Sequence, residues 1–364
     1  MSKSTAIVGA VALLIALKLM AYVLLTDMPL ESAMCQWDCG AYKEIVDIGY
    51  DAQMHFVVGC CWQANWAFFP LFPLLILSLK SFIDASTGVL GIIVSSAFFW
   101  AFALLGVKYR VVTRHETSVW PWLIVLLCGP NSFYFQAGYT ESLFAMLVML
   151  IFLGLVHHRP WVAAIATGFL TATRPTGVLM AILLGFRQLW AVRLAKSWGE
   201  GLSSLAPLAV APLGIIGFMT FLYFHIGDAL AFLHIQSGWG RTGGNPLRVL
   251  SAPFISWKTG HLERSAVYFA AWAILGLMAA AWLASRRFFA EAWLCGAVII
   301  LALSSGSLQS MPRFVATNPA FLLAAADFWV LIQSRYLRAI IALTLVGLQA
   351  VLVLEWSKRV FYLI

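Results

Sequence analysis

Long apolar runs separated by short polar segments make up most of the chain. A helix needs about 20 apolar residues to cross the hydrocarbon core of a bilayer. One run, 161–190, is interrupted by Thr173-Arg174-Pro175-Thr176-Gly177 and is too short for two full crossings, so it predicts two short helices that meet at a break. Counting both, the pattern predicts about eleven transmembrane helices. The other predicted spans lie at 5–26, 88–107, 118–135, 142–156, 203–225, 266–285, 289–305, 319–333 and 338–356.

The composition agrees with this pattern. The 364 residues are 62% hydrophobic and only 10% charged, whereas soluble domains are about 25% charged. The sequence therefore predicts an all-α polytopic membrane protein surrounded by membrane lipids. The net charge of +8 would also suit a nucleic-acid-binding protein. The basic residues, however, concentrate in the loops that the positive-inside rule assigns to the cytoplasm, so we expect no nucleic acid partner.

The segment 68–80 decides the orientation of the spans. If this segment crossed the membrane, Lys108, Arg110 and Arg114 would lie outside. If it is a helix in the outer interface, these residues lie inside, as the positive-inside rule favours. We therefore predict an interfacial helix, an inner N-terminus and an outer C-terminus.

This topology places both long loops, 27–66 and 226–265, on the external face. The cytoplasmic loops are short and basic, and no internal repeat or soluble domain interrupts the chain. We expect a single transmembrane domain over 1–364 whose chemistry faces outward.

The first external loop carries the main catalytic candidate. Asp38 follows Trp37 and precedes a small, turn-prone pair of residues. A carboxylate at the membrane surface could take a proton from an acceptor hydroxyl, and such a base contributes about 10²–10⁴-fold to a rate. Alternatively, Asp38 caps a helix over 41–48, because Asp is favoured at helix N-termini.

Two further segments carry candidate charges. Glu141 in Tyr139-Thr140-Glu141 could support the base or bind a sugar hydroxyl. Alternatively, it only stabilises the fourth span through a favourable interaction with the helix dipole, and Thr140 caps that helix. Arg174 lies inside an apolar run, where a charge is costly unless it faces a cavity or a partner. Because its Pro-Thr-Gly break could free backbone N–H groups, we predict a phosphate ligand, with a structural ion pair as the alternative.

The remaining candidates lie in external turns. Arg313 follows Pro312 and could be a second phosphate ligand or an ordinary interfacial arginine. The second long loop contains Gln236, Trp239 and Arg241, which could contact a sugar or acceptor or form an ordinary polar loop.

Cysteines and isolated charges add little chemistry. Cys35, Cys39, Cys60 and Cys61 share one external loop, where one or two disulfides are expected. Lys18 and Asp327 lie within predicted spans and could line a groove for a lipid phosphate. The sequence shows no nucleotide-binding loop and no metal signature, so no cofactor is expected. A base at Asp38 does not require a divalent metal, although Asp38 together with Glu141 could hold one.

The motifs, taken in order, resemble the PIG-V-like family, which comprises the second mannosyltransferase of GPI-anchor assembly and its shorter bacterial relatives, within the GT-C glycosyltransferases. They are Trp37-Asp38 with Tyr42 and Gly49-Tyr50, Phe68-Phe69-Pro70-Leu71-Phe72-Pro73, Tyr139-Thr140-Glu141-Ser142-Leu143-Phe144, Arg174-Pro175-Thr176-Gly177, and Met311-Pro312-Arg313-Phe314.

The resemblance implies a GT-C fold and an inverting transfer of a sugar, mannose in the best-known members, from a polyprenyl- or dolichyl-phosphate donor on the extracytoplasmic face. It places Asp38 at the position of the catalytic acid of GT-C enzymes. Trp37 and Tyr42 are then expected to contact the sugar or the acceptor, which is a lipid or a glycan. Because the chain ends without an endoplasmic-reticulum retrieval signal, we expect a bacterial inner-membrane enzyme with a periplasmic-facing active site.

The main alternative is a transporter or flippase for a lipid-linked saccharide, which would also have many spans, buried charges and a broken helix. Such proteins often carry a broken helix in each half of the chain. This sequence shows one such break, so an enzyme is the preferred interpretation.

Overall fold

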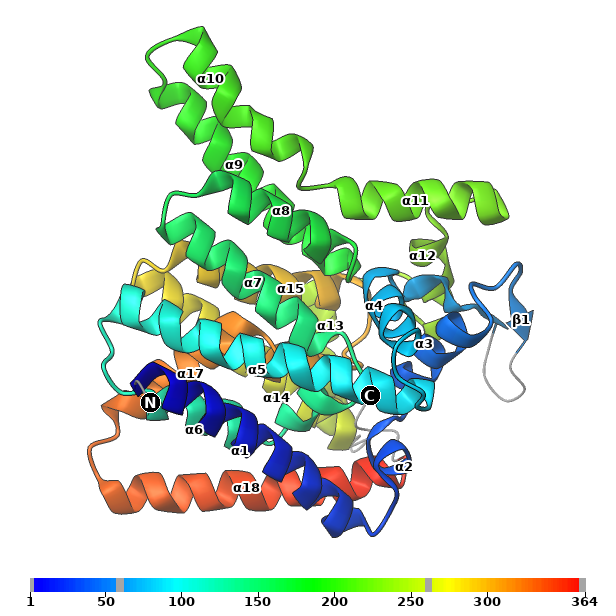
Figure 1. Cartoon of the computed structure of the whole chain (residues 1–364), viewed down its shortest axis with the longest axis vertical. Coiled ribbons are helices and arrows are strands. Elements are labelled where there is room, and N and C mark those ends of the chain that lie inside the picture. The colour runs from blue at the N-terminus through cyan, green and yellow to red at the C-terminus, as the bar shows by residue number, and fades with distance from the viewer. Residues whose placement is uncertain (1–2, 57–61, 259–263, 360–364) are drawn as a thin grey trace.

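The computed structural model describes residues 3–56, 62–258 and 264–359 and consists mainly of helices that run side by side (Figure 1). The longer helices are α1 (Lys3–Thr26), α3 (Asp38–Asp47), α4 (Leu71–Lys80), α5 (Thr87–Arg114), α6 (Trp120–Cys128), α7 (Glu141–Val156), α8 (Pro160–Thr171), α9 (Val178–Leu194), α10 (Trp198–Leu205), α11 (Leu213–Ile226), α13 (Pro246–Lys258), α14 (Arg264–Ser285), α15 (Phe289–Ser304), α17 (Pro319–Leu331) and α18 (Arg335–Ser357).

Short elements connect these helices. They are the helices α2 (Leu30–Met34), α12 (Ala231–His234) and α16 (Met311–Ala316), the 3-10 turns η1 (Asn65–Ala67), η2 (Ser132–Gln136), η3 (Pro175–Gly177), η4 (Ala206–Ala209) and η5 (Ile235–Trp239), and the antiparallel two-residue strands β1 (His55–Phe56) and β2 (Trp62–Gln63).

Five helical segments in the described residues are long and apolar enough to cross a membrane, namely Thr5–Thr26, Thr87–Arg114, Pro175–Leu194, Arg264–Ser285 and Arg335–Ser357. A sixth becomes possible if the bent pair Trp198–Ala209 and Leu213–Ile226 forms one span. The helices α7, α8, α15 and α17 are apolar but shorter. These findings support an all-α polytopic membrane protein, while the total of eleven spans and the GT-C fold stay predictions.

Two predicted spans are not continuous helices. The run 118–135 ends as a helix at Cys128 because Gly129 and Pro130 follow, and Pro has no N–H with which to continue the ladder. The run 203–225 bends by 49° between α10–η4 and α11, in a segment that contains Pro207 and Pro212. Apolar residues continue through the second break, so the hydrophobic pattern alone does not reveal it, whereas the first break coincides with the turn-forming residues Gly129, Pro130 and Asn131.

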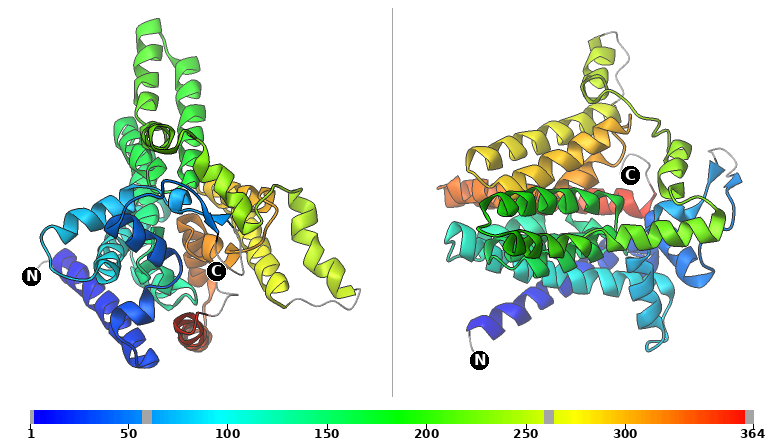
Figure 2. Two further views of the ribbon diagram at one scale, coloured as in Figure 1. Left: turned by 90° about the vertical axis from the view of Figure 1, so that its right-hand side faces the viewer. Right: turned by 90° about the horizontal axis from the view of Figure 1, so that it is seen from above.

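The two ends of the helix array carry different loops (Figure 1). The start of α1 and the connections α5–α6, α7–α8 and α17–α18 lie at one end. The elements α2, α3, α4 and α12 and the end of α18 lie at the other, which faces the viewer in the left view of Figure 2. This division matches the predicted topology, and the face that each end presents in a membrane stays a prediction.

The first loop is folded and positions α3. Asp51 and Asn65 form two hydrogen bonds with each other. Asp51 N donates to Asn65 Oδ1 at 3.0 Å, and Asn65 N donates to Asp51 Oδ2 at 2.8 Å. Asp47 at the end of α3 accepts from Lys80 Nζ and Thr87 Oγ1, both at 2.6 Å. The ten-residue helix α4 is about 15 Å long at 1.5 Å per residue, about half the thickness of a hydrocarbon core. It is therefore too short to cross, in agreement with the predicted interfacial helix.

Buried ion pairs join α5, α15 and α17 near the end that carries the N-terminus. Arg110 Nη1 lies 2.6 Å from Asp327 Oδ1, and Arg114 Nη2 lies 2.5 Å from Glu291 Oε2. Asp327 is therefore a structural partner of two arginines and does not line a groove for a lipid phosphate.

The helix packing gives a first prediction. Gly106 of α5 faces the buried ring of Trp122, and a Cβ at this position would overlap that ring. The ring is also fixed, because its Nε1 donates to Ala103 O at 2.9 Å. Gly106→Ala should lower the thermal unfolding midpoint in detergent, because overpacking costs about 1–3 kcal/mol.

Gly185→Ala is the matched control, since a Cβ there meets nothing within 4 Å. This substitution should leave the midpoint unchanged or raise it, because Ala favours a helix over Gly by about 1 kcal/mol. Equal midpoints for the two variants would contradict the close packing of α5 on α6.

Candidate active site

Asp38 is the first residue of α3 and follows a turn in which Trp37 has φ 47° and ψ −111°. Its Oδ2 accepts a hydrogen bond from Arg313 Nη1 at 2.7 Å. Among the residues that the structure describes, its Oδ1 accepts no hydrogen bond, and the side chain is 26% exposed. One carboxylate oxygen is thus fixed and the other is open to a ligand.

Arg313 lies in α16, a helix that begins directly after Ser310, which adopts a left-handed conformation with φ 66°. Its side chain is buried between two acids, because its Nε also lies 3.3 Å from Glu141 Oε1. Its guanidinium group sits over the ring of Tyr139, 5.2 Å from the centroid. Burial alone would lower the pKa of Arg313, but the charges of Asp38 and Glu141 raise it above its ordinary value.

Glu141 begins α7 at the end of a buried segment. Its Oε1 binds Arg174 Nη1 at 2.8 Å, while Oε2 has no hydrogen-bond partner among the described residues. Thr140 does not cap α7 through its side chain. An unpaired buried carboxylate oxygen costs free energy, so Oε2 is a natural place for a hydroxyl of a ligand to donate.

Arg174 occupies the break between α8 and α9 in an extended conformation. Gly177 lets this break pack against α8, because a Cβ there would come within 2.5 Å of Leu170 O. The N–H groups of Gly177 and Val178 donate to backbone carbonyls, so these two groups do not form the open anion site that the sequence suggested. The Arg174 guanidinium lies near the rings of Phe144 and Phe314 and carries the ion pair with Glu141.

The second long loop approaches the same charges. Arg241 Nη1 donates to Gln236 Oε1 at 2.7 Å. Burial, together with the positive charges of Arg313 and Arg174, lowers the pKa of Arg241, while Asp38 acts in the opposite direction. Arg241 therefore belongs to the electrostatic environment of Asp38.

Aromatic rings line one side of this group. Tyr42 packs edge-to-face on Phe68 and Phe72, and Phe68 in turn meets the ring of Trp239 at 6.3 Å. Burial, followed by the charge of Asp38, raises the pKa of the Tyr42 hydroxyl, which therefore stays protonated. Trp37 packs on a different hydrophobic cluster, which contains Tyr139 and Trp356.

The structure thus brings together five charged residues from five segments, which we call the charge cluster. It has three guanidinium groups and two carboxylates, a net charge of +1. Its members are Asp38, Glu141, Arg174, Arg241 and Arg313. Both arginines predicted to bind phosphate already hold carboxylates, so the ion-pair alternative for Arg174 is present in this structure.

Tyr139 is a site residue whose role the sequence did not indicate. Its hydroxyl accepts from Asp38 N at 3.2 Å and donates to Gln36 O at 3.1 Å, while its ring lies under Arg313. In the sequence, Tyr139 was noted only as part of the segment Tyr139-Thr140-Glu141, without a role of its own. No local pattern links it to a turn about a hundred residues earlier.

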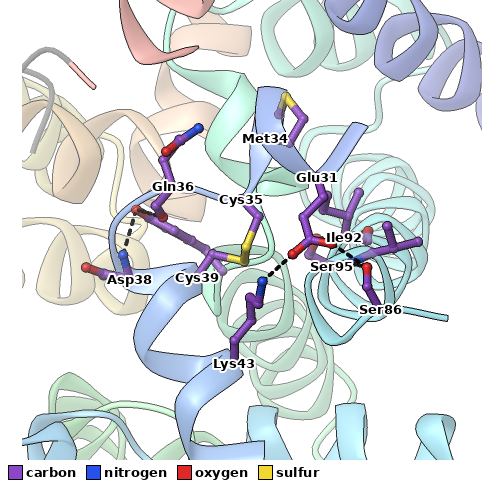
Figure 3. Close-up of a disulfide and its surroundings, with 12 residues drawn as sticks. Glu31, Met34, Cys35, Gln36, Asp38, Cys39, Lys43, Ser86, Ile92 and Ser95 are labelled. Carbon is purple, nitrogen blue, oxygen red and sulfur yellow. Dashed lines mark hydrogen bonds and ion pairs between the residues drawn. A yellow bond between two sulfur atoms is a disulfide. The ribbon is translucent and has the colours of Figure 1, made fainter. Parts of the chain in front are cut away.

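The cysteines are partly accounted for. Cys35 and Cys39 form a disulfide beside Asp38 (Figure 3), whereas Cys60 and Cys61 lie outside the described residues. In residues 3–56, 62–258 and 264–359, no group of three or more His, Cys, Asp and Glu side chains is placed to hold a metal ion.

Lys18 lies away from the charge cluster. It lines a cavity of about 380 Å³ between α1, α6 and α18, and its Nζ donates to Ser132 Oγ at 2.5 Å. The buried rings of Tyr22, Tyr134 and Trp356 belong to the cluster that packs between these helices and the Asp38 turn. Lys18 and the arginines therefore do not share one groove.

Comparisons with known proteins give two distant relatives. The chain is 27% identical over 145 residues to GPI mannosyltransferase 2 of Schizosaccharomyces pombe, covering 38% of this chain and 31% of that protein. It is 25% identical over 257 residues to GPI alpha-1,6-mannosyltransferase 2 of Cricetulus griseus, covering 62% and 48%. The matches thus span less than half the length of either relative. No family model matches the chain. The two relatives support the resemblance to PIG-V-like proteins, and a bacterial origin stays a prediction.

The charge cluster gives a second prediction. Glu141→Gln removes the carboxylate of Arg174 and one of the two partners of Arg313. Breaking a buried ion pair from one side costs about 3–5 kcal/mol, because the partner charge stays buried. We expect a clearly lower thermal unfolding midpoint in detergent.

The control is Glu355→Gln, which removes a carboxylate whose partner Lys358 is exposed. Exposed pairs contribute about 0–1 kcal/mol, so its midpoint should stay close to that of the unaltered protein. A Glu141→Gln protein as stable as this control would mean that the buried pairs do not hold the site together.

Proposed function

We propose that this protein is an integral-membrane inverting glycosyltransferase that moves a sugar, mannose in the first instance, from a polyprenyl- or dolichyl-phosphate donor to a hydroxyl of a lipid or glycan acceptor. The observation that carries this proposal is the arrangement at Asp38. One oxygen is held by Arg313 and the other is open, beside a surplus of guanidinium groups. The names of the two relatives, both mannosyltransferases, support the same reaction.

In the proposed reaction, Asp38 Oδ1 takes the proton of the acceptor hydroxyl as the hydroxyl oxygen attacks the anomeric carbon. The bond between that carbon and the phosphate oxygen breaks, and the polyprenyl phosphate leaves with the bonding electrons. A single displacement inverts the anomeric configuration. Because phosphate is already a good leaving group, one carboxylate suffices, whereas glycoside hydrolysis uses a pair.

The charges of the site fit a donor with one phosphate. A sugar linked through a phosphodiester carries one negative charge, which matches the net +1 of the charge cluster. The leaving phosphomonoester gains a second negative charge, so preorganised guanidinium groups favour the transition state over the bound donor. Arg174 and Arg313 are assigned to the phosphate, and half-buried Arg241 joins them because the positive charges of Arg313 and Arg174 help to lower its pKa.

The remaining candidates are assigned to the sugar and the acceptor. Glu141 Oε2 can accept from a hydroxyl. Tyr42 and Trp239 present aromatic surfaces beside Phe68, and Gln236 orients Arg241. Trp37, which packs away from these rings, is assigned to shaping the turn before Asp38. The scheme requires no cofactor.

We place the reaction on the extracytoplasmic face, since α3, α12 and α16 lie at the end that the basic residues assign to the outside. A bacterial inner membrane with a periplasmic-facing site fits this arrangement. Because the apolar helices lie in the bilayer, the lipid-linked donor can reach the site by diffusing laterally within the membrane.

The third prediction tests the base. Asp38→Asn should reduce transfer of radiolabelled mannose from polyprenyl-phosphate-mannose into the lipid and glycan fractions by about 10²-fold or more, because the amide accepts no proton. Expression and donor binding should persist. The control Asp84→Asn, at an exposed position on the same side, should transfer normally. Normal turnover by Asp38→Asn would remove Asp38 from the mechanism.

The fourth prediction tests the phosphate assignment. Arg241→Gln should raise the donor KM about tenfold, equivalent to a loss of about 1.4 kcal/mol, because one charge-assisted contact disappears. Arg248→Gln, at an exposed position of the same loop, is the control. Identical donor KM values for both variants would exclude Arg241 from the phosphate site.

A further inference from the structure

The turn that carries Asp38 is closed by a covalent bond. Cys35 directly follows α2, and Cys39 is the second residue of α3. Their disulfide encloses only Gln36, Trp37 and Asp38 (Figure 3). In the same view, Lys43 reaches Glu31, so α2 and α3 are also joined by an ion pair. Two links on either side of the turn therefore fix how α3 begins relative to α2.

The enclosed turn needs such support because its backbone is unfavourable. Trp37 has φ 47°, and a positive φ is disfavoured for a residue with a Cβ, most of all for a bulky one. Conformations of this kind persist only where the surroundings over-determine them, and they concentrate at functional sites. Without the disulfide, the turn would be expected to relax and to move Asp38.

The disulfide also connects the turn to the segment that precedes Glu141. Gly138 has φ +70°, and a Cβ on it would come within 2.7 Å of Cys39 Sγ, so the sulfur packs directly on this backbone. Its neighbour Tyr139 accepts from Asp38 N and donates to Gln36 O. The Cys39 sulfur and the Tyr139 hydroxyl therefore fix the position of Asp38 relative to the segment that leads into Glu141.

We propose that the Cys35–Cys39 disulfide, together with Gly138 and Tyr139, is a positioning device that aims Asp38 at the acceptor hydroxyl. This inference rests on the proposed function of Asp38. The cysteines touch neither donor nor acceptor, and they act by holding the turn. A displacement of about 1 Å at a reacting group can cost about 10²-fold in rate, so loss of the bond should affect turnover more than binding.

The test uses the full chain in lipid nanodiscs and the variant Cys35→Ser/Cys39→Ser. We expect kcat to fall about tenfold or more, with a donor KM within about twofold of the normal value, because the arginines stay in place. Cys128→Ser is the control, since Cys128 lies in α6, away from the turn. Its kcat should be unchanged. Dithiothreitol should lower kcat of the unaltered protein and leave the double-serine variant unaffected.

Tyr139→Phe keeps the disulfide and removes only the hydroxyl, so it tests the device even if the double-serine variant does not fold. It should lower kcat with little change in donor KM. Gly138→Ala should also lower kcat, and by a smaller factor in the double-serine background, because the shorter serine side chain leaves room for the added methyl group.

The outcomes separate the two proposals. Normal kcat in both Cys35→Ser/Cys39→Ser and Tyr139→Phe, alongside an inactive Asp38→Asn, would overturn the positioning device and leave the proposed function standing. An active Asp38→Asn would overturn the proposed function itself. Parallel changes in kcat and donor KM in the cysteine variant would also contradict the device, since they indicate a general loss of site structure.

Discussion

The guanidinium group of Arg313 is shared between Asp38 and Glu141, and the candidate site depends on this sharing. Asp38 and Arg313 are separated by 275 positions in the sequence. Each buried charge alone would be costly, yet together with Arg174 they compensate one another. In the proposed function, the positive charge of Arg241 makes the site suited to an anionic ligand. Folding and the proposed function would then rely on the same set of charges.

The protein has two separate groups of buried charges, which differ in how their carboxylates are paired. Arg110 and Arg114, near the other end of the helices, meet Asp327 and Glu291 in pairs that join three helices. The charge cluster, by contrast, keeps one oxygen of Asp38 and one of Glu141 without a hydrogen-bond partner among the described residues. In the other group, Arg110 Nε also lacks a partner, but every carboxylate oxygen of Asp327 and Glu291 accepts a hydrogen bond. Carboxylate oxygens without a partner are therefore found in the charge cluster and not in this group, and such buried groups call for an explanation, which a bound substrate would provide.

Local sequence patterns predicted the apolar helices, the break at Arg174 and a short separate helix at α4, because each depends on nearby residues, while the position of α4 in the membrane interface stays a prediction. They did not predict the bend before α11, since hydrophobicity continues around Pro207 and Pro212. The end of α6 at Cys128 was missed because the apolar residues on both sides of Gly129-Pro130-Asn131 were read as one span, although this tripeptide is a turn signal. The charged candidates were found one at a time. Their pairing, the role of Tyr139 and the choice of Cys39 as the partner of Cys35 depend on contacts between distant segments or on backbone geometry that composition does not encode.

The most direct test of the account is a structure of the protein in nanodiscs with a non-reactive polyprenyl-phosphate-sugar analogue. The account predicts that the phosphate contacts the guanidinium groups of Arg174, Arg241 or Arg313, with the anomeric carbon facing Asp38 Oδ1 on the side opposite the phosphate. A phosphate bound elsewhere, for example beside Lys18 between α1, α6 and α18, would contradict it.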